Sequence, residues 1–206
     1  MAPSVRERIL QATYECVARH GLAKTTIEDA ARQAKLSRAT VYRYFPGGRD
    51  QLLNDVIAWE TGRFFLRLAE AVHGVETFPE LLEEALLFAH RAVEQHAVLQ
   101  KILQTEPERL LPTLTIESER IRPLISAFLV PYLERQWQGR PSTMASDAAT
   151  DYVARMVLSF IGAPGRWDLA DRSQVRTLVE TELLAGVLAA GRGRATPVQG
   201  HARPLA

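Results

Sequence analysis

Residues 37–44 carry a high density of hydrogen-bond donors on a short segment. The donors are hydroxyl, phenol and guanidinium groups, and they belong to Ser37, Arg38, Thr40, Tyr42, Arg43 and Tyr44. Such groups bind phosphate oxygens, and a guanidinium can also donate two hydrogen bonds to the edge of a guanine. Val41 is the residue of this segment suited to burial, so most of its polar surface is free for a partner. The pattern predicts contact with a groove of DNA.

Helices must position these side chains, and the surrounding pattern predicts three. In the first, small and apolar residues recur at spacings of three and four, the period of a buried helical face, at Ile27, Ala30, Ala31 and Ala34. Ser37 can cap the second, because its hydroxyl can accept a bond from a backbone N–H one turn later. The third should begin near residue 49 or 50 and run to about 73. Two short helices at a sharp turn before a long one predict a helix-turn-helix.

An earlier helix completes the predicted N-terminal domain. Ser4 and Glu7 have the spacing of a capping box, in which each side chain accepts from the other residue's backbone N–H. Gly21 should end this helix, and Thr25 or Thr26 should cap the next one. We therefore expect a three-helix domain over residues 1–48.

The charges of the chain are unevenly distributed. Residues 1–50 contain nine Lys or Arg and five Asp or Glu, a net charge of +4. The whole chain carries +1, so the remainder carries −3. This asymmetry favours a protein that touches phosphate at one end, although a patchy solvated surface can look similar.

Residues 26–52 resemble the signature of the TetR family of bacterial transcriptional regulators. The family pattern is T-V-x-x-I-A-x-x-A-G-V-S-x-x-T-L-Y-x-Y-F with a later leucine, and the matching residues are Thr26, Ile27, Ala31, Ala34, Leu36, Ser37, Thr40, Val41, Tyr42, Tyr44, Phe45 and Leu52. A signature of this length is far more specific than a short motif. The resemblance is specific over residues 5 to about 70 and weak beyond them.

Three positions depart from the family pattern. Ala30 replaces a larger aliphatic residue, Lys35 replaces the turn glycine, and the Pro-Gly-Gly-Arg link of residues 46–49 is one residue longer than usual. A left-handed conformation at Lys35 carries a strain on the order of 1 kcal/mol. We therefore expect the local geometry of the turn to differ from the family's.

The resemblance implies which residues hold phosphates, namely Thr26, Tyr42, Tyr44 and Arg49. The start of a recognition helix usually reaches the base edges, so we expect Arg38, Ala39 and Thr40 to read sequence, with Arg43 as a further candidate. Arg38 can equally hold a phosphate. We expect Phe45 to be a core aromatic, whereas for Tyr44 contact with DNA is favoured over burial.

Composition and length narrow the class of protein. The chain has 206 residues, of which 47% are hydrophobic, as in an ordinary globular protein. Its longest apolar stretches are far shorter than the roughly 20 residues that span a bilayer, and no secretory leader precedes Ser4. We expect a cytoplasmic protein. The lone cysteine, Cys16, lies on an apolar helical stripe and is interpreted as a small core residue, with redox sensing as the alternative.

The rest of the chain has helical periodicity and frequent prolines, so an all-α C-terminal domain is expected over residues 49–190. Predicted helices cover residues 79–95, 97–104, 108–114, 116–137, 146–161 and 173–190. Pro123 and Pro131 should kink or break the fourth of these. Residues 191–206 lack apolar periodicity, which predicts disorder.

One helix-turn-helix covers too little DNA for tight and selective binding, so a homodimer on a palindromic site is expected. The final two helices, which form the dimer contact in the resembling family, each carry an apolar stripe. The predicted dimer residues are Tyr152, Val153, Met156, Val157, Phe160, Val175, Leu178, Val179, Leu183 and Val187. Such stripes can equally form an intramolecular core.

The resemblance also implies a small-molecule effector that binds the C-terminal domain and releases DNA, with coupling through the long fourth helix. Candidate pocket residues are Phe64, Leu68, Phe88, His90, Leu103, Leu124, Phe128 and Trp137. Because few charges lie on these faces, an apolar or aromatic effector is favoured. Each of these residues can alternatively be plain core.

Two other classes of protein are alternatives to a regulator. They are an all-α enzyme and a protein-interaction or ligand-binding module without sequence-specific DNA binding. The sequence contains no nucleophile beside a base, no phosphate-binding glycine loop and no Cys/His metal cluster. The paired carboxylates Glu83 and Glu84 are expected on a solvated face. We therefore expect no enzymatic activity, no cofactor and no metal, and the dense donor face of residues 37–44 disfavours the interaction module.

Overall fold

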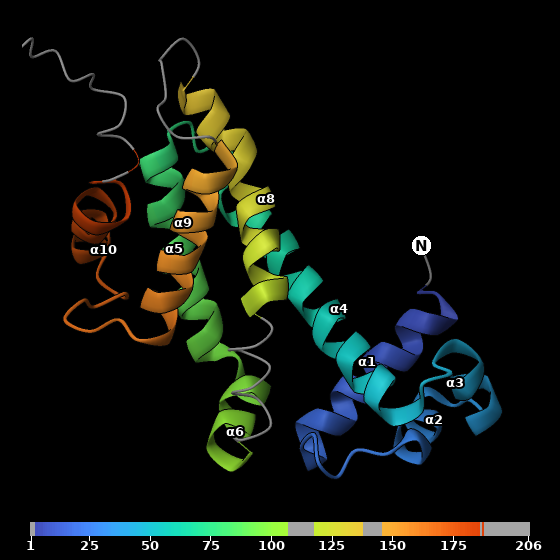
Figure 1. The fold of residues 1–206 in the computed structure, drawn as a ribbon. Coiled ribbons are helices and arrows are strands. Elements are labelled where there is room, and N and C mark those ends of the chain that lie inside the picture. The colour runs from blue at the N-terminus through green and yellow to red at the C-terminus, as the bar shows by residue number, and fades with distance from the viewer. Residues whose placement is uncertain (1–2, 107–117, 138–145, 186, 188–206) are drawn as a thin grey trace, which may run out of the picture.

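The computed structural model describes residues 3–106, 118–137, 146–185 and 187. Among these residues every regular element is helical and no strand occurs, which confirms the predicted all-α class. In Figure 1 the helices form an N-terminal bundle at the lower right and a larger C-terminal bundle, joined by the long helix α4. No helix in this described part is long and apolar enough to cross a membrane.

Three helices and the start of a fourth form the N-terminal bundle. α1 (Val5–His20) begins at the predicted capping box, in which the Glu7 carboxylate accepts the Ser4 N–H at 2.7 Å. α2 (Ile27–Ala34) and α3 (Arg38–Tyr44) follow. Their shared core buries Ile9, Leu10, Ala12, Ile27, Ala30, Ala31, Ala34, Val41, Phe45, Leu52 and Val56. Ala30 is fully buried there, so its small side chain allows the close helix packing expected from the alanine spacing.

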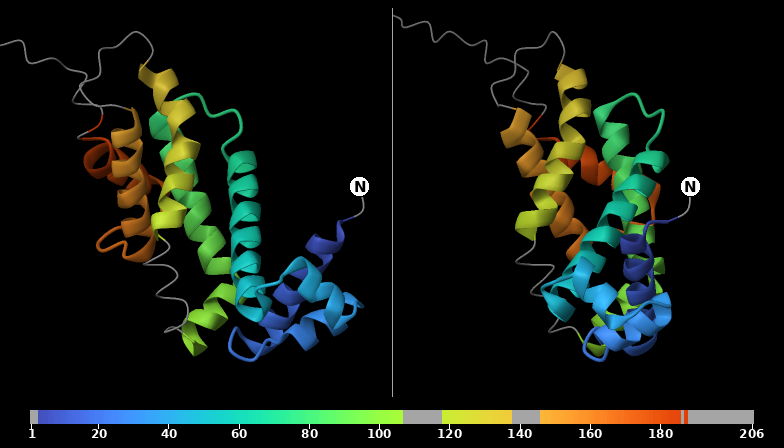
Figure 2. Two further views of the ribbon diagram at one scale, coloured as in Figure 1. Left: turned by 45° about the vertical axis from the view of Figure 1, so that its right-hand side comes forward. Right: turned by 90° about the vertical axis from the view of Figure 1, so that its right-hand side faces the viewer.

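The connector α4 (Gly48–Ala71) belongs to both bundles. Leu52 and Val56 pack into the N-terminal core, whereas Leu68 packs into the C-terminal core. Figure 2 (left) shows α4 rising from the N-terminal bundle beside the C-terminal helices. A rigid helix of this length can therefore carry a displacement from one bundle to the other.

The C-terminal bundle surrounds one central helix. That helix is α5 (Phe78–Gln95), which packs against α4 and against all the other helical elements of this bundle. The others are α6 (Ala97–Thr105), α8 (Ser118–Trp137), α9 (Ser146–Gly162), α10 (Arg172–Leu178) and the π-helical segment η1 (Val179–Leu183). α8 and α9 lie side by side and run in opposite directions (Figures 1 and 2).

Of the kink or break predicted at Pro123 and Pro131, the break does not occur, because α8 continues through both prolines. Both prolines are exposed, and a proline inside a helix leaves the carbonyl one turn earlier without its usual donor. The predicted helix over residues 108–114 and the predicted disorder of residues 191–206 lie outside the described residues.

The last predicted helix is interrupted by a π-helical turn. Its buried residues are Val175, Leu178, Val179, Leu183, Leu184 and Val187. Val175, Val179, Leu183 and Val187 are spaced by four residues, slightly more than one α-helical turn of 3.6 residues. The wide turn, closed by the Leu184 N–H donating to the Val179 carbonyl at 2.9 Å, brings them back to the core.

One carboxylate expected on a solvated face is buried. Glu83 of α5 is only 5% exposed and accepts hydrogen bonds from Arg172 at 2.7 Å and from Arg176 at 3.0 Å. Burial raises the pKa of Glu83, but the hydrogen bonds from Arg176 and Arg172 outweigh it and lower the pKa overall. Glu83 therefore ties α5 to α10 as an ion-paired core residue.

Candidate nucleic-acid interface

The starts of α2 and α3 are fixed by capping side chains. Thr26 accepts the Asp29 N–H at 3.1 Å, and the Asp29 carboxylate accepts the Thr26 N–H in return. Ser37 accepts the Thr40 N–H at 3.1 Å, as predicted. The hydrogen bond from the Thr26 hydroxyl is the main cause that lowers the pKa of Asp29. Both helix starts are therefore held rigidly, with Thr26 and Ser37 exposed.

The recognition helix α3 presents its polar side chains outward. Val41 and Phe45 are fully buried, whereas Tyr42 is 43% exposed and Tyr44 is 37% exposed. The Arg43 guanidinium lies over the Tyr44 ring, 5.5 Å from its centroid. The apolar side chains of this segment are therefore buried in the core, and its polar side chains lie on the surface.

Three residues at the start of α3 were expected to read bases. Ala39 is exposed. The Thr40 hydroxyl lies 2.9 Å from the Ser37 hydroxyl, so Thr40 offers mainly its methyl group. Arg38 Nη2 lies 2.7 Å from Oε1 of Glu28, a residue of α2 that the sequence pattern did not connect with Arg38. Pairing between two helices leaves no periodic signal in a sequence.

Arg49 does not lie free at the start of α4. Its guanidinium donates to the carbonyls of Thr25 at 2.8 Å, Leu22 at 2.5 Å and Ala23 at 3.1 Å. These bonds direct its Nε and Nη2 donors to the turn that joins α1 to α2. Arg49 therefore helps to fix the turn that precedes Thr26, and the expected contact with a phosphate stays a prediction.

Lys35 has the left-handed conformation anticipated at the missing glycine, with φ 56° and ψ 46°. Its backbone N–H closes the end of α2 by donating to the carbonyls of Ala31 and Arg32. The added link residue is likewise accommodated by a positive φ, 69° at Gly48. Both departures from the family pattern are thus absorbed in turns that join the elements of the bundle.

The turn between α1 and α2 is also held by α6, which the sequence did not reveal. Lys101 donates to the carbonyls of Ala18 at 2.9 Å and Arg19 at 3.0 Å. The Glu106 carboxylate accepts the Ala23 N–H at 2.8 Å. Behind these bonds Ile102 packs with Val17 and Leu22 of the N-terminal bundle. The C-terminal bundle therefore contacts the N-terminal bundle at a second place besides α4.

The predicted effector residues are not all gathered at one place. Phe64, Leu68, Phe88, Phe128 and Trp137 belong to the C-terminal core or pack against it, and His90 is half-buried on α5. The ring centroids of Phe64 and Phe88 are 5.6 Å apart. Leu103 packs instead in the small cluster between α1 and α6, and Leu124 is 49% exposed. An aromatic group therefore spans α4, α5 and α8, with Leu103 and Leu124 outside it.

Most of the predicted dimer residues lie inside the core of the single chain. Val153, Val175, Leu178, Val179, Leu183 and Val187 have at most 1% of their surface exposed. They offer no surface to a partner, so the intramolecular alternative holds for these six. Tyr152, Met156, Val157 and Phe160, all on α9, remain partly exposed.

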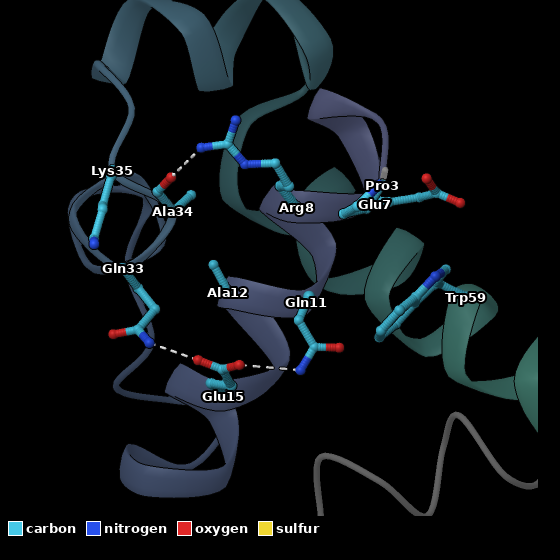
Figure 3. A pocket seen from close by; sticks show the side chains of 10 residues that line it. All are labelled: Pro3, Glu7, Arg8, Gln11, Ala12, Glu15, Gln33, Ala34, Lys35 and Trp59. Carbon is cyan, nitrogen blue, oxygen red and sulfur yellow. Dashed lines mark hydrogen bonds between the residues drawn. The ribbon is translucent and has the colours of Figure 1, made fainter. Parts of the chain in front are cut away.

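A surface cleft of about 630 Å³ lies between α1, the end of α2 and Trp59 of α4 (Figure 3). Several of its polar side chains are hydrogen-bonded to other residues of the lining. Gln11 and Gln33 both donate to Glu15, and Arg8 donates to the Ala34 carbonyl at 3.0 Å. These bonds brace α1 against α2.

Comparisons with known proteins agree with this geometry. Residues 9–56 match the model of the bacterial regulatory proteins of the tetR family. Two uncharacterised HTH-type transcriptional regulators of Mycobacterium tuberculosis, MT0206 of strain CDC 1551 and Rv0196 of strain H37Rv, are each 29% identical over 79 residues. That match spans 38% of this chain and 41% of the relatives' length.

Solved structures show the same fold over most of the chain. The TetR family repressor AlkX of Dietzia sp. has a TM-score of 0.64 at 21% identity, covering 90% of this chain and 97% of AlkX. The TetR family repressor QsdR of R. erythropolis has a TM-score of 0.60 at 21% identity, covering 89% and 95%. The fatty acid degradation regulator FadR of Bacillus halodurans has a TM-score of 0.54 at 16% identity, covering 87% and 96%. At these identities the likeness establishes the fold.

Proposed function

We propose that this chain, whose N-terminal helix-turn-helix belongs to the TetR family of bacterial regulatory proteins, is a transcriptional regulator that binds a palindromic DNA operator as a homodimer. The observation that carries the proposal is the outward face of α3. Its apolar residues Val41 and Phe45 are fully buried, while its arginines and tyrosines face solvent. The exposed donors of this face can therefore bind a nucleic acid.

The arrangement suits the major groove, which is wide enough to admit one α-helix. With α3 in the groove, Arg38 and Ala39 at its start face the base edges, and Arg43 follows one turn later. Tyr42, Tyr44 and Thr26 then hold phosphates on either side, which positions the protein without reading sequence. Ser37 fixes the start of the helix. Arg49 supports this surface from behind.

A dimer is proposed to form through the exposed face of the α8–α9 pair. Tyr152, Met156, Val157 and Phe160 keep partly exposed apolar surface on α9, and Leu124 is exposed on neighbouring α8. A self-complementary patch of this kind gives a two-fold dimer, and the two recognition helices then face two half-sites of a palindrome.

A small and largely apolar effector is proposed to act on the C-terminal bundle and to relieve repression. Phe64, Phe88, Phe65 and Phe128 form a chain of ring contacts across α4, α5 and α8, with centroid separations of 5.5 to 6.2 Å. An apolar molecule inserted among these rings displaces α4, which reaches the N-terminal bundle. A switch from 1:99 to 99:1 needs about 5.5 kcal/mol of differential affinity between the two conformations.

The salt dependence of binding to duplex DNA tests the DNA-binding part of this proposal. For a protein that contacts phosphates, the logarithm of the binding constant falls linearly with the logarithm of the salt concentration. The slope is about −0.9 per phosphate neutralised. Fluorescence anisotropy with a labelled duplex at several salt concentrations measures that slope. The expected result is a steep negative slope and a complex with the mass of two chains per duplex. Absence of duplex binding at low salt would refute the function.

A further inference from the structure

The recognition helix does not present Arg38 as a free cation. Its Nη2 atom lies 2.7 Å from Oε1 of Glu28, in the first turn of α2, and the two side chains are 61% and 48% exposed. An ion pair this exposed contributes little to folding stability. α2 is held instead by the Thr26–Asp29 capping box and by its buried alanines. The pair therefore needs an explanation other than stability.

We propose that Glu28 is a specificity-determining residue, which acts by aiming Arg38 at a base edge. This inference rests on the proposed DNA-binding function. The Glu28 carboxylate contacts one guanidinium nitrogen, Nη2, and this contact limits the orientations of the Arg38 side chain. The other N–H groups of the guanidinium stay available, and guanine O6 and N7 accept a pair of such donors. An unheld arginine beside DNA is drawn to phosphates, which carry no sequence information.

The negative charge of Glu28 has a second expected effect, which is to weaken binding to DNA of any sequence. Glu28 follows Thr26 by two residues, so it lies near the phosphate that Thr26 is proposed to hold. A negative charge there lowers the affinity for every duplex, whatever its sequence. Glu28 thus lowers non-specific affinity while it increases discrimination at one base pair. A residue with a purely structural role produces neither effect.

The test uses the full-length protein and the duplex that it enriches from a random-sequence pool at moderate salt. Affinities for this duplex, for each of its single-base-pair variants and for an unrelated duplex are measured by fluorescence anisotropy. The variants are Glu28→Gln, Glu28→Asp, Arg38→Ala and the Glu28→Gln/Arg38→Ala double variant. Asp50→Asn is the matched control, because Asp50 is an exposed carboxylate of the same bundle that does not contact Arg38.

Arg38→Ala is expected to abolish discrimination at one base pair. Glu28→Gln is expected to reduce discrimination at that same base pair about fivefold and to raise affinity for the unrelated duplex about two- to fivefold. Glu28→Asp keeps the charge but is shorter by one methylene, so discrimination falls while non-specific affinity stays the same. In the Arg38→Ala background, Glu28→Gln changes discrimination no further. Asp50→Asn leaves discrimination unchanged.

Two results overturn the inference while the DNA-binding function stands. In the first, Glu28→Gln and Glu28→Asp keep the discrimination of the unaltered protein at every base pair. In the second, Glu28→Gln loses discrimination at a base pair other than the one that Arg38→Ala affects, which means that Glu28 contacts a base itself. If the unaltered protein enriches no sequence, the proposed function fails and the inference fails with it.

Discussion

At the scale of single residues, the side chains of the N-terminal bundle divide into those that hold the chain and those left for a partner. Arg49 shows the division most clearly, since its guanidinium binds three backbone carbonyls of one turn. The exposed phenol of Tyr42 is its opposite, with 43% of the side chain open to solvent. A cation and a phenol that both look suited to phosphate therefore lie in different surroundings.

Replacing Arg49 by alanine should destabilise the fold. The three lost hydrogen bonds come from a partly exposed charged group, so we expect a decrease of about 1–2 kcal/mol in the free energy of unfolding. Urea unfolding followed by circular dichroism measures it. The slope of affinity against salt tests the predicted phosphate contact. A slope shallower by about one phosphate would show that Arg49 also binds DNA, and an unchanged slope would show that it only fixes the turn.

Replacing Tyr42 by phenylalanine should have the reverse effect. The ring stays, so folding stability should be unaltered, whereas the loss of the hydroxyl should weaken binding to all duplexes about equally, by roughly fivefold. Anisotropy titrations with the enriched duplex and with an unrelated one make the comparison. A loss confined to a single base pair would place Tyr42 among the residues that read sequence.

At the scale of elements, the turn between α1 and α2 is held from two sides. Arg49 at the start of α4 binds its carbonyls, and α6 binds it through Lys101 and Glu106. Gly21 lies in this turn with φ 83°, and a Cβ atom there would clash with the Glu106 carboxylate. A movement of α6 therefore moves the segment that presents Thr26, in addition to any movement passed along α4.

Glu106→Ala should loosen this turn. The Ala23 N–H loses the carboxylate that accepts it, so its amide hydrogen should exchange faster, while amides in the middle of α1 keep their rates. Exchange measured by nuclear magnetic resonance at single residues checks this, with Gln104→Ala on the same helix as the control. Unchanged exchange at Ala23 would show that α6 does not hold the turn.

At the scale of the whole molecule, α5 joins the elements of the C-terminal bundle, and Glu83 fastens it to α10. The apolar stripe of the last helix, which was predicted to contact a second chain, is buried in this core, since Val175, Leu178 and Leu183 have no exposed surface. In the proposed dimer, the partner chain therefore contacts the outer face of α8 and α9. The apolar period of a helix predicts that a face is buried, but not whether its own chain or a second chain buries it.

Glu83 should make folding stability depend on pH. The pKa of Glu83 is lowered in the folded protein, so its contribution is complete above the pKa of the unfolded chain and is lost as pH falls through the lower folded value. Glu83→Gln should cost about 1–2 kcal/mol at neutral pH and less at acidic pH. Melting curves across this range measure it. An equal cost at all pH values would contradict the ion-paired role.

Local signals allowed much of the fold to be predicted. The caps at Ser4 and Ser37, the end at Gly21 and the apolar period of α4 are set by residues within a few positions of one another, so the sequence displays them. The contacts that were missed, Glu28 with Arg38 and Lys101 with Ala18, join different helices. The burial of Glu83 was missed for the same reason, because its arginine partners are about 90 positions away.

Selection from random duplexes tests directly whether the exposed face of α3 reads DNA sequence. The protein is mixed with a random-sequence pool at moderate salt, bound duplexes are recovered through several rounds, and the products are sequenced. An enriched palindrome is expected, with half-sites separated by about one turn of DNA or a multiple of it. With Arg38→Ala the same palindrome should lose its preference at one base pair of each half-site. Recovery of duplexes without any shared sequence would contradict the proposal that α3 reads sequence.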